Sequence, residues 1–364
     1  MIIKLLNKNR SFLPILTIPL LFSFLGIFFI FEASAVRSFN YFNDSFYYAK
    51  LQFFWIILGI LLMIFLSFFD YHNFYYLAFI IMFLTIFLLV LVLIPQIGQN
   101  AGGARRWINL GLFNLQPTEL AKFSLVVYLS SWFVHKERKR FFSFLILISF
   151  LMFLIILQPD MGTAIIIFLL GISLYFLAGF NIWHILLFIP PSFVIFLILV
   201  KLSPYRIARL LTFLNPSVDP LGISYHLNQI IISLQNGGFF GLGFGASRQK
   251  YLFLPEAHTD SIFAIIAEEL GFFSIFLIII FFLIFSYKIF RLIEAAPDRL
   301  GKLLASGILA FFNWQFFINL AGIVNFLPLT GVPVPFISYG GSNLIVSFAF
   351  VGILLNIEKR IKKI

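Results

Sequence analysis

Residues 75–94 read YYLAFIIMFLTIFLLVLVLI, twenty consecutive positions without a charged side chain. A helix of about 20 apolar residues is long enough to cross the hydrocarbon core of a bilayer. Similar runs recur along the chain and predict an all-α polytopic membrane protein, a single integral membrane domain over residues 1–364. We expect ten transmembrane helices, at residues 12–33, 51–69, 75–94, 118–134, 141–157, 162–180, 182–200, 261–287, 303–325 and 343–357.

The composition excludes most other classes of protein. Of the 364 residues, 62% are hydrophobic and 11% are charged, against about 45–50% and about 25% in soluble domains. A soluble enzyme and a disordered chain are therefore excluded. The chain has no cysteine, which excludes disulfides, thiolate metal sites, iron–sulfur clusters and cysteine nucleophiles. The net charge of +11 is explained by basic residues that flank the spans and meet anionic lipid, and we expect no nucleic-acid partner.

The distribution of Lys and Arg predicts the orientation of the chain. With the N-terminus in the cytoplasm, 15 of these residues fall in inside segments, 9 fall outside and Lys122 lies within a span. Basic residues favour the cytoplasmic side, so both termini are expected to be cytoplasmic. The large loop at about residues 201–260, between spans 7 and 8, is then extracytoplasmic. Within it we expect short helices at residues 205–214 and 225–234, the second stopped by Asn236-Gly237-Gly238.

The acidic residues at this outer face are the first candidates for chemistry. Asp260 ends the run Pro-Glu-Ala-His-Thr-Asp at residues 255–260, close to Glu256 and His258. A carboxylate at a partly dry mouth of the bundle has a raised pKa and can act as a base. The alternative is a helix N-cap, because Asp starts helices well. The sequence alone leaves both open.

Other polar residues sit where spans meet outer loops. Glu119 and Lys122 are three positions apart, just after a helix start at residues 116–118. They either form an ion pair within the helix or line a polar cavity. Asp160 caps the sixth span or faces the same cavity. Arg105 and Arg106 follow two glycines and are free to bind an anion such as a lipid-linked pyrophosphate. The glycines form no nucleotide-binding pattern.

Two further segments have polar or irregular backbone at membrane depth. Glu268 and Glu269 lie about two turns inside the eighth span, where we expect one of them to pair with a cation from another helix in a structural or gating role. Residues 327–342, LPLTGVPVPFISYGGS, carry three prolines and three glycines in a mildly apolar run. They predict a re-entrant or tightly packed loop, since such backbone must be satisfied by protein or water.

These motifs together resemble the SEDS family (shape, elongation, division and sporulation). The matching segments follow the family's order over nearly the whole chain, at residues 101–111, 116–122, 158–163, 213–222, 255–271 and 327–342. The resemblance implies a peptidoglycan glycosyltransferase that polymerises lipid II on the outer face of the bacterial cytoplasmic (inner) membrane. It also implies release of undecaprenyl pyrophosphate and partnership with a class B penicillin-binding protein, a transpeptidase, among other divisome or elongasome membrane proteins.

The resemblance also assigns roles to particular residues. Asp260 matches the family's essential aspartate, and Glu119, Lys122 and Asp160 match positions that line the central cavity. Ala257, Thr330 and residues 249–251 and 352–356 look more like the FtsW branch than the RodA branch, which favours a septal role in cell division over lateral-wall elongation. Ser261 departs from the family, because an aromatic residue usually follows the aspartate; so do Gln235 and Asn236, which replace a small-residue stretch.

The chemistry implied is the attack of a sugar hydroxyl on an anomeric carbon that bears a pyrophosphate. Asp260 is the expected base, and cations should meet the leaving group. The expected substrate-binding residues are Glu119, Lys122, Asp160, Arg105, Arg106, Arg206, Arg209, Glu256, His258 and Ser338. No cofactor is assigned; a divalent cation such as Mg²⁺ or Mn²⁺ is an alternative to the basic residues, with its ligands unknown. A lipid II flippase and a non-catalytic scaffold are the rival functions; charged motifs at one face and the lack of a visible repeat disfavour the flippase.

Overall fold

The structure is a computed structural model that describes residues 13–101, 104–111, 113–135, 140–201, 204–217, 219–220 and 222–361. These residues are mostly helical, and each predicted span overlaps a helix, with ends that differ by up to nine residues. The spanning candidates are α2 (Leu13–Phe42), α3 (Tyr47–Phe68), α4 (Asn73–Leu91), α5 (Pro117–Trp132), α6 (Phe141–Ile156), α7 (Met161–Leu177), α8 (Ile182–Lys201), α11 (Ile262–Ala295), α12 (Arg299–Ile323) and α13 (Gly341–Ile361).

Five helices in the described part of the chain are long and apolar enough to cross a membrane, namely α2, α3, α4, α11 and α12. The helices α6 and α7 are apolar but shorter. The chain is therefore a multi-pass helical membrane protein by length and composition, whereas the full number of ten spans stays a prediction.

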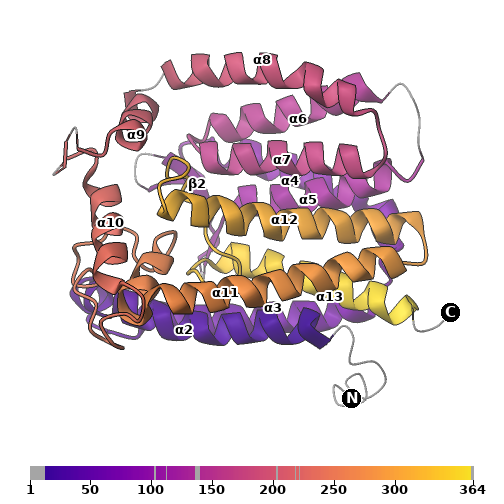
Figure 1. Cartoon of the computed structure of the whole chain (residues 1–364). Helices are drawn as coiled ribbons and strands as arrows, with labels where there is room; N and C mark the ends of the chain where they lie inside the picture. Colours follow the sequence, from indigo (N-terminus) through magenta and orange to yellow (C-terminus); the bar gives the residue numbers. More distant parts are fainter. Residues whose placement is uncertain are drawn as a thin grey trace.

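The helices run side by side, and the connecting segments gather at the two ends of the bundle (Figure 1). Helices α9 (Pro204–Leu214) and α10 (Tyr225–Gly237) lie at one end, which we call the loop end. Their presence confirms the two short helices expected between spans 7 and 8. The start of α2 and the end of α13 lie at the opposite end. The large loop and the two chain ends are thus on opposite sides of the bundle.

The fold is not entirely α-helical, which corrects the expectation from the sequence. A three-stranded antiparallel sheet at the loop end consists of β1 (Gly98–Ala101), β2 (Ala104–Asn109) and β3 (Asn114–Leu115), in the order β1-β2-β3. Gly98 pairs with Ile108, and Ile108 in turn pairs with Leu115. Outside the apolar run of α4 the chain must satisfy its backbone by other means, and strand pairing does so here. The expected turn glycines, Gly102 and Gly103, lie outside the described residues.

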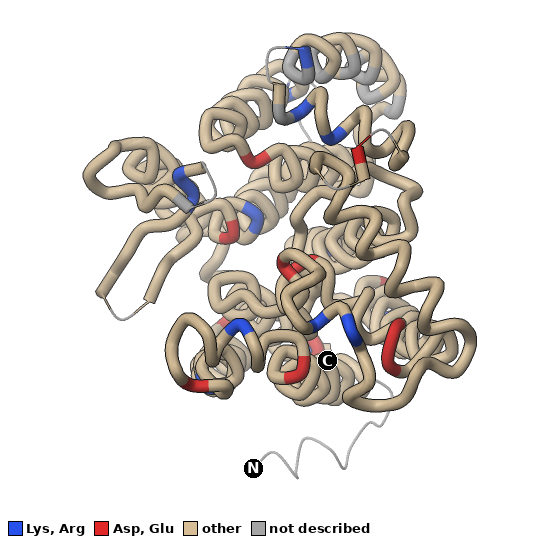
Figure 2. The backbone as a smooth tube through the Cα atoms, turned by 90° about the vertical axis from the view of Figure 1, so that its left-hand side faces the viewer, with Lys and Arg blue, Asp and Glu red and all other residues tan. Residues whose placement is uncertain are grey.

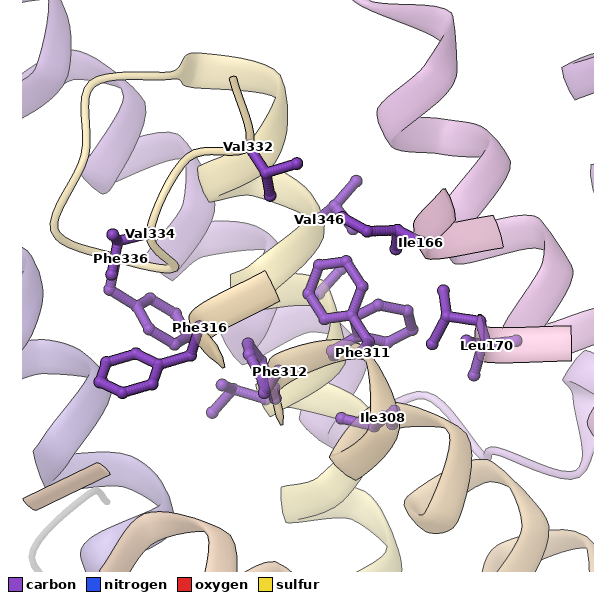
Figure 3. Close-up of a cluster of buried hydrophobic side chains, with 14 of the residues drawn as sticks. Ile166, Leu170, Ile308, Phe311, Phe312, Phe316, Val332, Val334, Phe336 and Val346 are labelled. Atoms are coloured by element: carbon purple, nitrogen blue, oxygen red, sulfur yellow. The ribbon is translucent and has the colours of Figure 1, made fainter. Parts of the chain in front are cut away.

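The segment at residues 327–340 is tightly packed, as its sequence predicts. Val332, Val334 and Phe336 are buried against α12, where the rings of Phe336 and Phe312 lie 5.4 Å apart (Figure 3). Gly162 at the start of α7 permits close approach, because a Cβ there would lie 2.3 Å from the Thr330 carbonyl oxygen. This packing fixes the segment, here called the proline loop, beside the start of α11.

Helix α11 is interrupted at Gly271, whose backbone has φ 75° and ψ 179°. The backbone groups that lose their helical partners at the break form hydrogen bonds with the loop after α10. Phe272 N donates to the Gly238 carbonyl at 3.0 Å, and Leu242 N donates to the Glu268 carbonyl at 3.0 Å. Only glycine adopts this conformation readily. The break therefore anchors the large loop to the bundle and brings its last residues to the start of α11.

Candidate functional site

Asp260 lies in the turn that enters α11, and it is not the cap of that helix. The N-cap is Ser261 and the first helical residue is Ile262, so the capping alternative for Asp260 is wrong. The backbone carbonyl of Asp260 accepts a hydrogen bond from Asn319 Nδ2 at 2.7 Å, and the same amide donates to the Val332 carbonyl at 2.8 Å. Asn319 on α12 thus holds Asp260 against the proline loop.

The Asp260 carboxyl group is partly buried, and its surroundings favour the protonated form. Burial, together with the negative charge of Glu256, raises the pKa of Asp260 to about 6. The Thr259 hydroxyl, 3.3 Å from Asp260 Oδ1, and the charge of Arg209 act in the opposite direction. A carboxyl group with a pKa near the working pH can both accept and release a proton, as a general base requires.

Two arginines from other elements lie near the turn that carries Asp260. Arg209 on α9 donates to the Leu329 carbonyl at 2.9 Å, which ties α9 to the proline loop. Arg37 on α2 lies 3.6 Å from Glu256 Oε1. The sequence pattern identified Arg209 but not Arg37, which is separated by more than two hundred positions from its partner. The only sequence signal for Arg37 was its position just beyond the end of a predicted span.

His226 is a second residue that the sequence analysis missed. Its Nε2 lies 2.8 Å from the Ser261 hydroxyl, directly beside Asp260 in the chain. Ser261 makes no side-chain bond to its own helix, so the hydroxyl that could cap α11 serves α10 instead. Burial lowers the pKa of His226 to about 4, which keeps the ring neutral. The unusual Ser261 thus has a partner in this chain.

His258, Glu256 and Ser338 have different surroundings from one another. His258 is buried, and its ring lies 4.5 Å from the Tyr48 ring, centroid to centroid. Its backbone carbonyl accepts from Tyr339 N at 2.9 Å. Glu256 is exposed. The buried Ser338 hydroxyl accepts from Val334 N at 2.9 Å and closes a turn inside the proline loop. A substrate role for each of these three residues stays a prediction.

Glu119 and Lys122 form the intrahelical ion pair, at 2.7 Å between Glu119 Oε1 and Lys122 Nζ. Both side chains are almost fully buried, at 2% and 1% exposed. Asn343 Nδ2 donates to Glu119 Oε2 at 2.9 Å and to Gln315 Oε1 at 3.3 Å. The helix start expected at residues 116–118 is confirmed, because α5 begins at Pro117 with Gln116 as its N-cap. The substrate role of Glu119 and Lys122 stays a prediction.

Two buried amides of α12 lie on the side of this pair and on the side of the turn at Asp260. Gln315 and Asn319 lie four positions apart on α12 and therefore on one helix face. Asn319 contacts the Asp260 backbone, while Gln315 contacts Asn343, the partner of Glu119. The two polar sites identified from the sequence therefore both contact this face of α12, although no hydrogen bond joins Gln315 to Asn319.

Asp160 caps α7, as one of the two alternatives predicted. Its carboxylate accepts from Thr163 N at 3.1 Å and from the Thr163 hydroxyl at 2.9 Å. Arg106 on β2 donates to the carbonyls of Gln158 and Pro159, just before Asp160. Arg106 thus binds backbone, not an open surface. Arg105, on the same strand, and Arg206, on α9, are partly buried.

The acidic pair inside α11 is bonded by the large loop. Lys250 Nζ lies 3.2 Å from Glu269 Oε1 and 2.7 Å from Glu32 Oε2. Glu268 accepts from Asn236 Nδ2 at 3.2 Å and from the Ser247 hydroxyl. One of the two carboxylates does pair with a cation, but the expectation that another helix supplies it is wrong, because Lys250 belongs to the loop between α10 and α11.

The charged residues of the loop end carry both signs (Figure 2). Asp260, Glu256, Arg37, Arg209 and His226 come together there from α2, α9, α10 and the turn before α11. Among the described residues, no group of three or more His, Asp or Glu side chains could hold a metal ion. The residues present do not fit a resident divalent cation, and we derive no step through one.

The comparisons with known proteins agree with this architecture. The profile of the cell cycle protein family that groups FtsW, RodA and SpoVE matches residues 12–363. Stage V sporulation protein E of Bacillus subtilis is 38% identical over 359 residues, covering 97% of this chain and 98% of the relative. A probable peptidoglycan glycosyltransferase FtsW of Geobacter metallireducens is 37% identical over 366 residues, covering 99% and 98%.

Solved structures give the same result at the level of the fold. A chain from a peptidoglycan synthase complex, described as coordinating polymerization and crosslinking, has a TM-score of 0.75 at 26% identity and covers 93% of this chain and 98% of its own. The rod shape determining protein RodA of Thermus thermophilus has a TM-score of 0.70 at 25% identity, with 95% of each chain covered. The chain therefore belongs to the SEDS family, the FtsW, RodA and SpoVE family of cell cycle proteins.

Proposed function

We propose that the chain is a peptidoglycan glycosyltransferase that polymerises lipid II into glycan strands. The observation that carries the proposal is the Asp260 carboxyl group, partly buried at the loop end with a pKa raised to about 6. Asn319 holds its backbone, the charge of Arg209 acts on its carboxyl group, and the neighbouring Ser261 and Glu256 contact His226 and Arg37. Relatives that match nearly the full chain are named peptidoglycan glycosyltransferases, which supports the same reaction here.

The proposed reaction forms one glycosidic bond and breaks one bond to phosphate. The acceptor sugar hydroxyl attacks the anomeric carbon of the donor, and Asp260 takes the hydroxyl proton. The bond from the anomeric carbon to the phosphate oxygen breaks, and its electron pair leaves with undecaprenyl pyrophosphate. Arginine side chains can meet the charge that develops on this leaving group. The candidates are Arg209, whose charge acts on Asp260, and Arg37, which lies beside Glu256. The proton on Asp260 then returns to water.

The membrane setting suits substrates that are themselves lipids. The turn at Asp260 lies at an end of the apolar bundle, so a lipid-linked sugar can approach from the adjoining leaflet. We propose that this end is extracytoplasmic and that the membrane is the bacterial cytoplasmic (inner) membrane. Because the chain has no cysteine, a single introduced cysteine reports orientation. Phe240→Cys, at a position 79% exposed at the loop end, should react with an impermeant maleimide from outside, while Glu294→Cys should not.

We further propose a class B penicillin-binding protein as the partner and a septal role in cell division. The structural relative from a complex that coordinates polymerization and crosslinking supports the partner. Ala257, Thr330 and residues 249–251 support the division branch over the RodA-like elongation branch. Depletion of the chain from its host should then block septation before it alters cell width; the reverse order would assign it to the lateral wall.

The polymerase proposal is tested with the purified chain, its transpeptidase partner and fluorescent lipid II. We expect glycan polymer on a gel, together with release of undecaprenyl pyrophosphate. Translocation of lipid II across vesicles without polymer would indicate a flippase. Neither product, from a complex that is folded and assembled, would indicate a scaffold.

A further inference from the structure

The Thr259 hydroxyl lies between the two carboxyl groups of the turn at Asp260. Its Oγ1 is 3.0 Å from Glu256 Oε2, 3.1 Å from the Glu256 carbonyl oxygen and 3.3 Å from Asp260 Oδ1. While both carboxyl groups are ionised, all three neighbours are acceptors, whereas a threonine hydroxyl carries a single proton. The hydroxyl can therefore serve only one of them fully, and the two nearer acceptors both belong to Glu256.

Glu256 is held beside Thr259 by contacts of its backbone and of its side chain. Its φ is 48°, a left-handed conformation that residues other than glycine rarely adopt. Its carbonyl accepts from Thr259 N at 3.1 Å and from Ser261 N at 3.3 Å, while its Oε1 lies 3.6 Å from Arg37 on α2. Such a conformation persists only where the surrounding structure enforces it, and it is commonest at functional sites. The turn thus fixes the Glu256 carboxylate next to the hydroxyl.

The two oxygens of the Asp260 carboxyl group have different surroundings. Oδ1 faces Thr259, whereas no hydrogen bond reaches Oδ2 from the residues that the structure describes. Oδ2 lies toward Gly331 of the proline loop, where an added Cβ would be 3.6 Å from this oxygen and within 4 Å of no other described atom. Gly331 has φ 72°, a conformation that favours glycine. The lack of a side chain there leaves space beside Oδ2.

We propose that Glu256 and Thr259 are positioning residues that keep Asp260 basic: Glu256 draws the Thr259 hydroxyl proton toward itself, and Asp260 Oδ2 stays open to the acceptor sugar hydroxyl. The inference rests on the proposed function. A hydrogen bond to an ionised acceptor is about twice as strong as one to a neutral acceptor, so Glu256 competes best while it is charged. An ionised Asp260 without a donor is poorly stabilised and takes up a proton more readily. The sugar hydroxyl proton then goes to Oδ2, and the electron pair of its O–H bond forms the new bond to the anomeric carbon.

The protonation of Asp260 can be followed separately from that of its neighbours. The other titratable or charged groups near this turn are Arg37 on α2, Tyr48 on α3, Arg209 on α9, His226 on α10 and His258 in the turn itself. Burial lowers the pKa of both histidines to about 4, so their rings are neutral above about pH 5. A fall of kcat/KM below about pH 6 therefore reports Asp260, whose pKa is about 6.

The test measures polymerisation of fluorescent lipid II across a range of pH by variants of the full chain, each with its transpeptidase partner. Glu256→Gln should move the acid limb of kcat/KM, its fall at low pH, downward by about one pH unit. The reason is that the variant removes the negative charge and lets the hydroxyl donate to Asp260. Asp44→Asn is the matched control, because it removes a carboxylate between α2 and α3 that pairs with Lys50 and is not among the groups that act on Asp260. We expect it to shift the limb by less than about 0.2 unit.

The hydroxyl is tested by a second pair of variants. Thr259→Val should lower kcat several-fold with little change in KM, because the Asp260 carboxyl group loses the contact that orients it. Thr259→Ser keeps the hydroxyl and should restore most of this kcat. In the Thr259→Val background, Glu256→Gln should shift the acid limb by about half as much as in the parent or less, because the hydroxyl no longer joins the two carboxyl groups. Equal shifts in both backgrounds would overturn the role of Thr259.

The infrared band of the Asp260 carboxyl group, identified by its absence from Asp260→Asn, gives the same titration without turnover. Polymer from the parent, with an acid limb and a carboxyl titration that Glu256→Gln leaves unchanged, overturns this inference and leaves the polymerase standing. A shifted carboxyl titration without polymer supports the effect of Glu256 on Asp260 and overturns the polymerase. Neither polymer nor a shift overturns both. If Glu256→Gln fails to fold, equal kcat values for Thr259→Val and Thr259→Ser overturn the inference.

Discussion

The buried pair of Glu119 and Lys122 gives a sharp quantitative prediction. Lys122→Met removes the only ion-pair partner, within the described part of the chain, of a carboxylate that is 2% exposed. What remains to Glu119 in the described residues is the neutral amide of Asn343, at 2.9 Å. Removing one partner of a buried ion pair typically costs about 3–5 kcal/mol, because it leaves an uncompensated charge. We expect Lys122→Met and Glu119→Gln each to lose stability on this scale.

The double variant, with both substitutions, should regain most of that stability. Gln at position 119 can still accept from Asn343, and Met fills the space of the lysine stem beside Phe311, whose ring lies 5.7 Å from Lys122 Nζ. Neutral replacements of a buried ion pair are often close to neutral in free energy. Because each single variant is expected to lose about 3–5 kcal/mol and the double variant little, the coupling energy between the two sites should reach roughly 5 kcal/mol or more.

The assay is unfolding of the four proteins by titration with a denaturing detergent in mixed micelles, followed by helix content. Losses that simply add, with a coupling below about 0.5 kcal/mol, would refute the pairing argument. The same four proteins should be assayed with lipid II. Activity restored in the double variant makes the pair structural, whereas a stable but inactive double variant assigns the lysine charge to substrate binding.

Four further predictions follow from the site. The pKa of Asp260 lies at about 6, above its ordinary 3.8, so kcat/KM should fall as the pH drops below about 6. Because its pKa is raised in the folded state, the Asp260 carboxyl group stabilises the fold at low pH, and this stabilisation is lost as the pH rises through 6. Asp260→Asn should therefore unfold at a higher temperature than the parent at pH 7 and at the same temperature at pH 4. His226→Phe should lower kcat several-fold with little change in KM, because the loss of the bond to Ser261 loosens the turn beside Asp260. His226→Gln should restore part of this loss in kcat. An unchanged kcat in a folded His226→Phe variant would show that His226 does not position Asp260. Gly162→Ala should destabilise the fold by about 1–3 kcal/mol, measured by detergent unfolding, since its Cβ would meet the Thr330 carbonyl at 2.3 Å; unaltered stability would show that the proline loop yields.

The helices were predictable because lipid imposes a simple requirement on sequence. Every long apolar run, such as residues 75–94, corresponds to a helix, since a spanning segment must satisfy its own backbone. The stop at Gly237 and Gly238 and the packed proline loop also follow from local residue properties. Asp260 was identified because a lone carboxylate at a membrane edge is costly and therefore conspicuous.

The rest depends on contacts between distant parts of the chain. His226 bonds Ser261 across 35 positions, and Arg37 faces Glu256 across more than 200. No local pattern marks either pairing. The break at Gly271 was missed for the same reason, because the groups that rescue its backbone belong to residues 238–243. The three-stranded sheet was missed because its strands are too short to give a clear alternating pattern.

The central claim is that Asp260 is the base of a lipid II polymerase. Its most direct test is the rate of glycan polymerisation by Asp260→Asn beside the parent, each purified with the transpeptidase partner and shown to be folded by its unfolding temperature. A general base typically contributes about 10²–10⁴-fold, so we predict a loss of at least about 100-fold. Substantial polymer from the folded Asn variant would contradict the account.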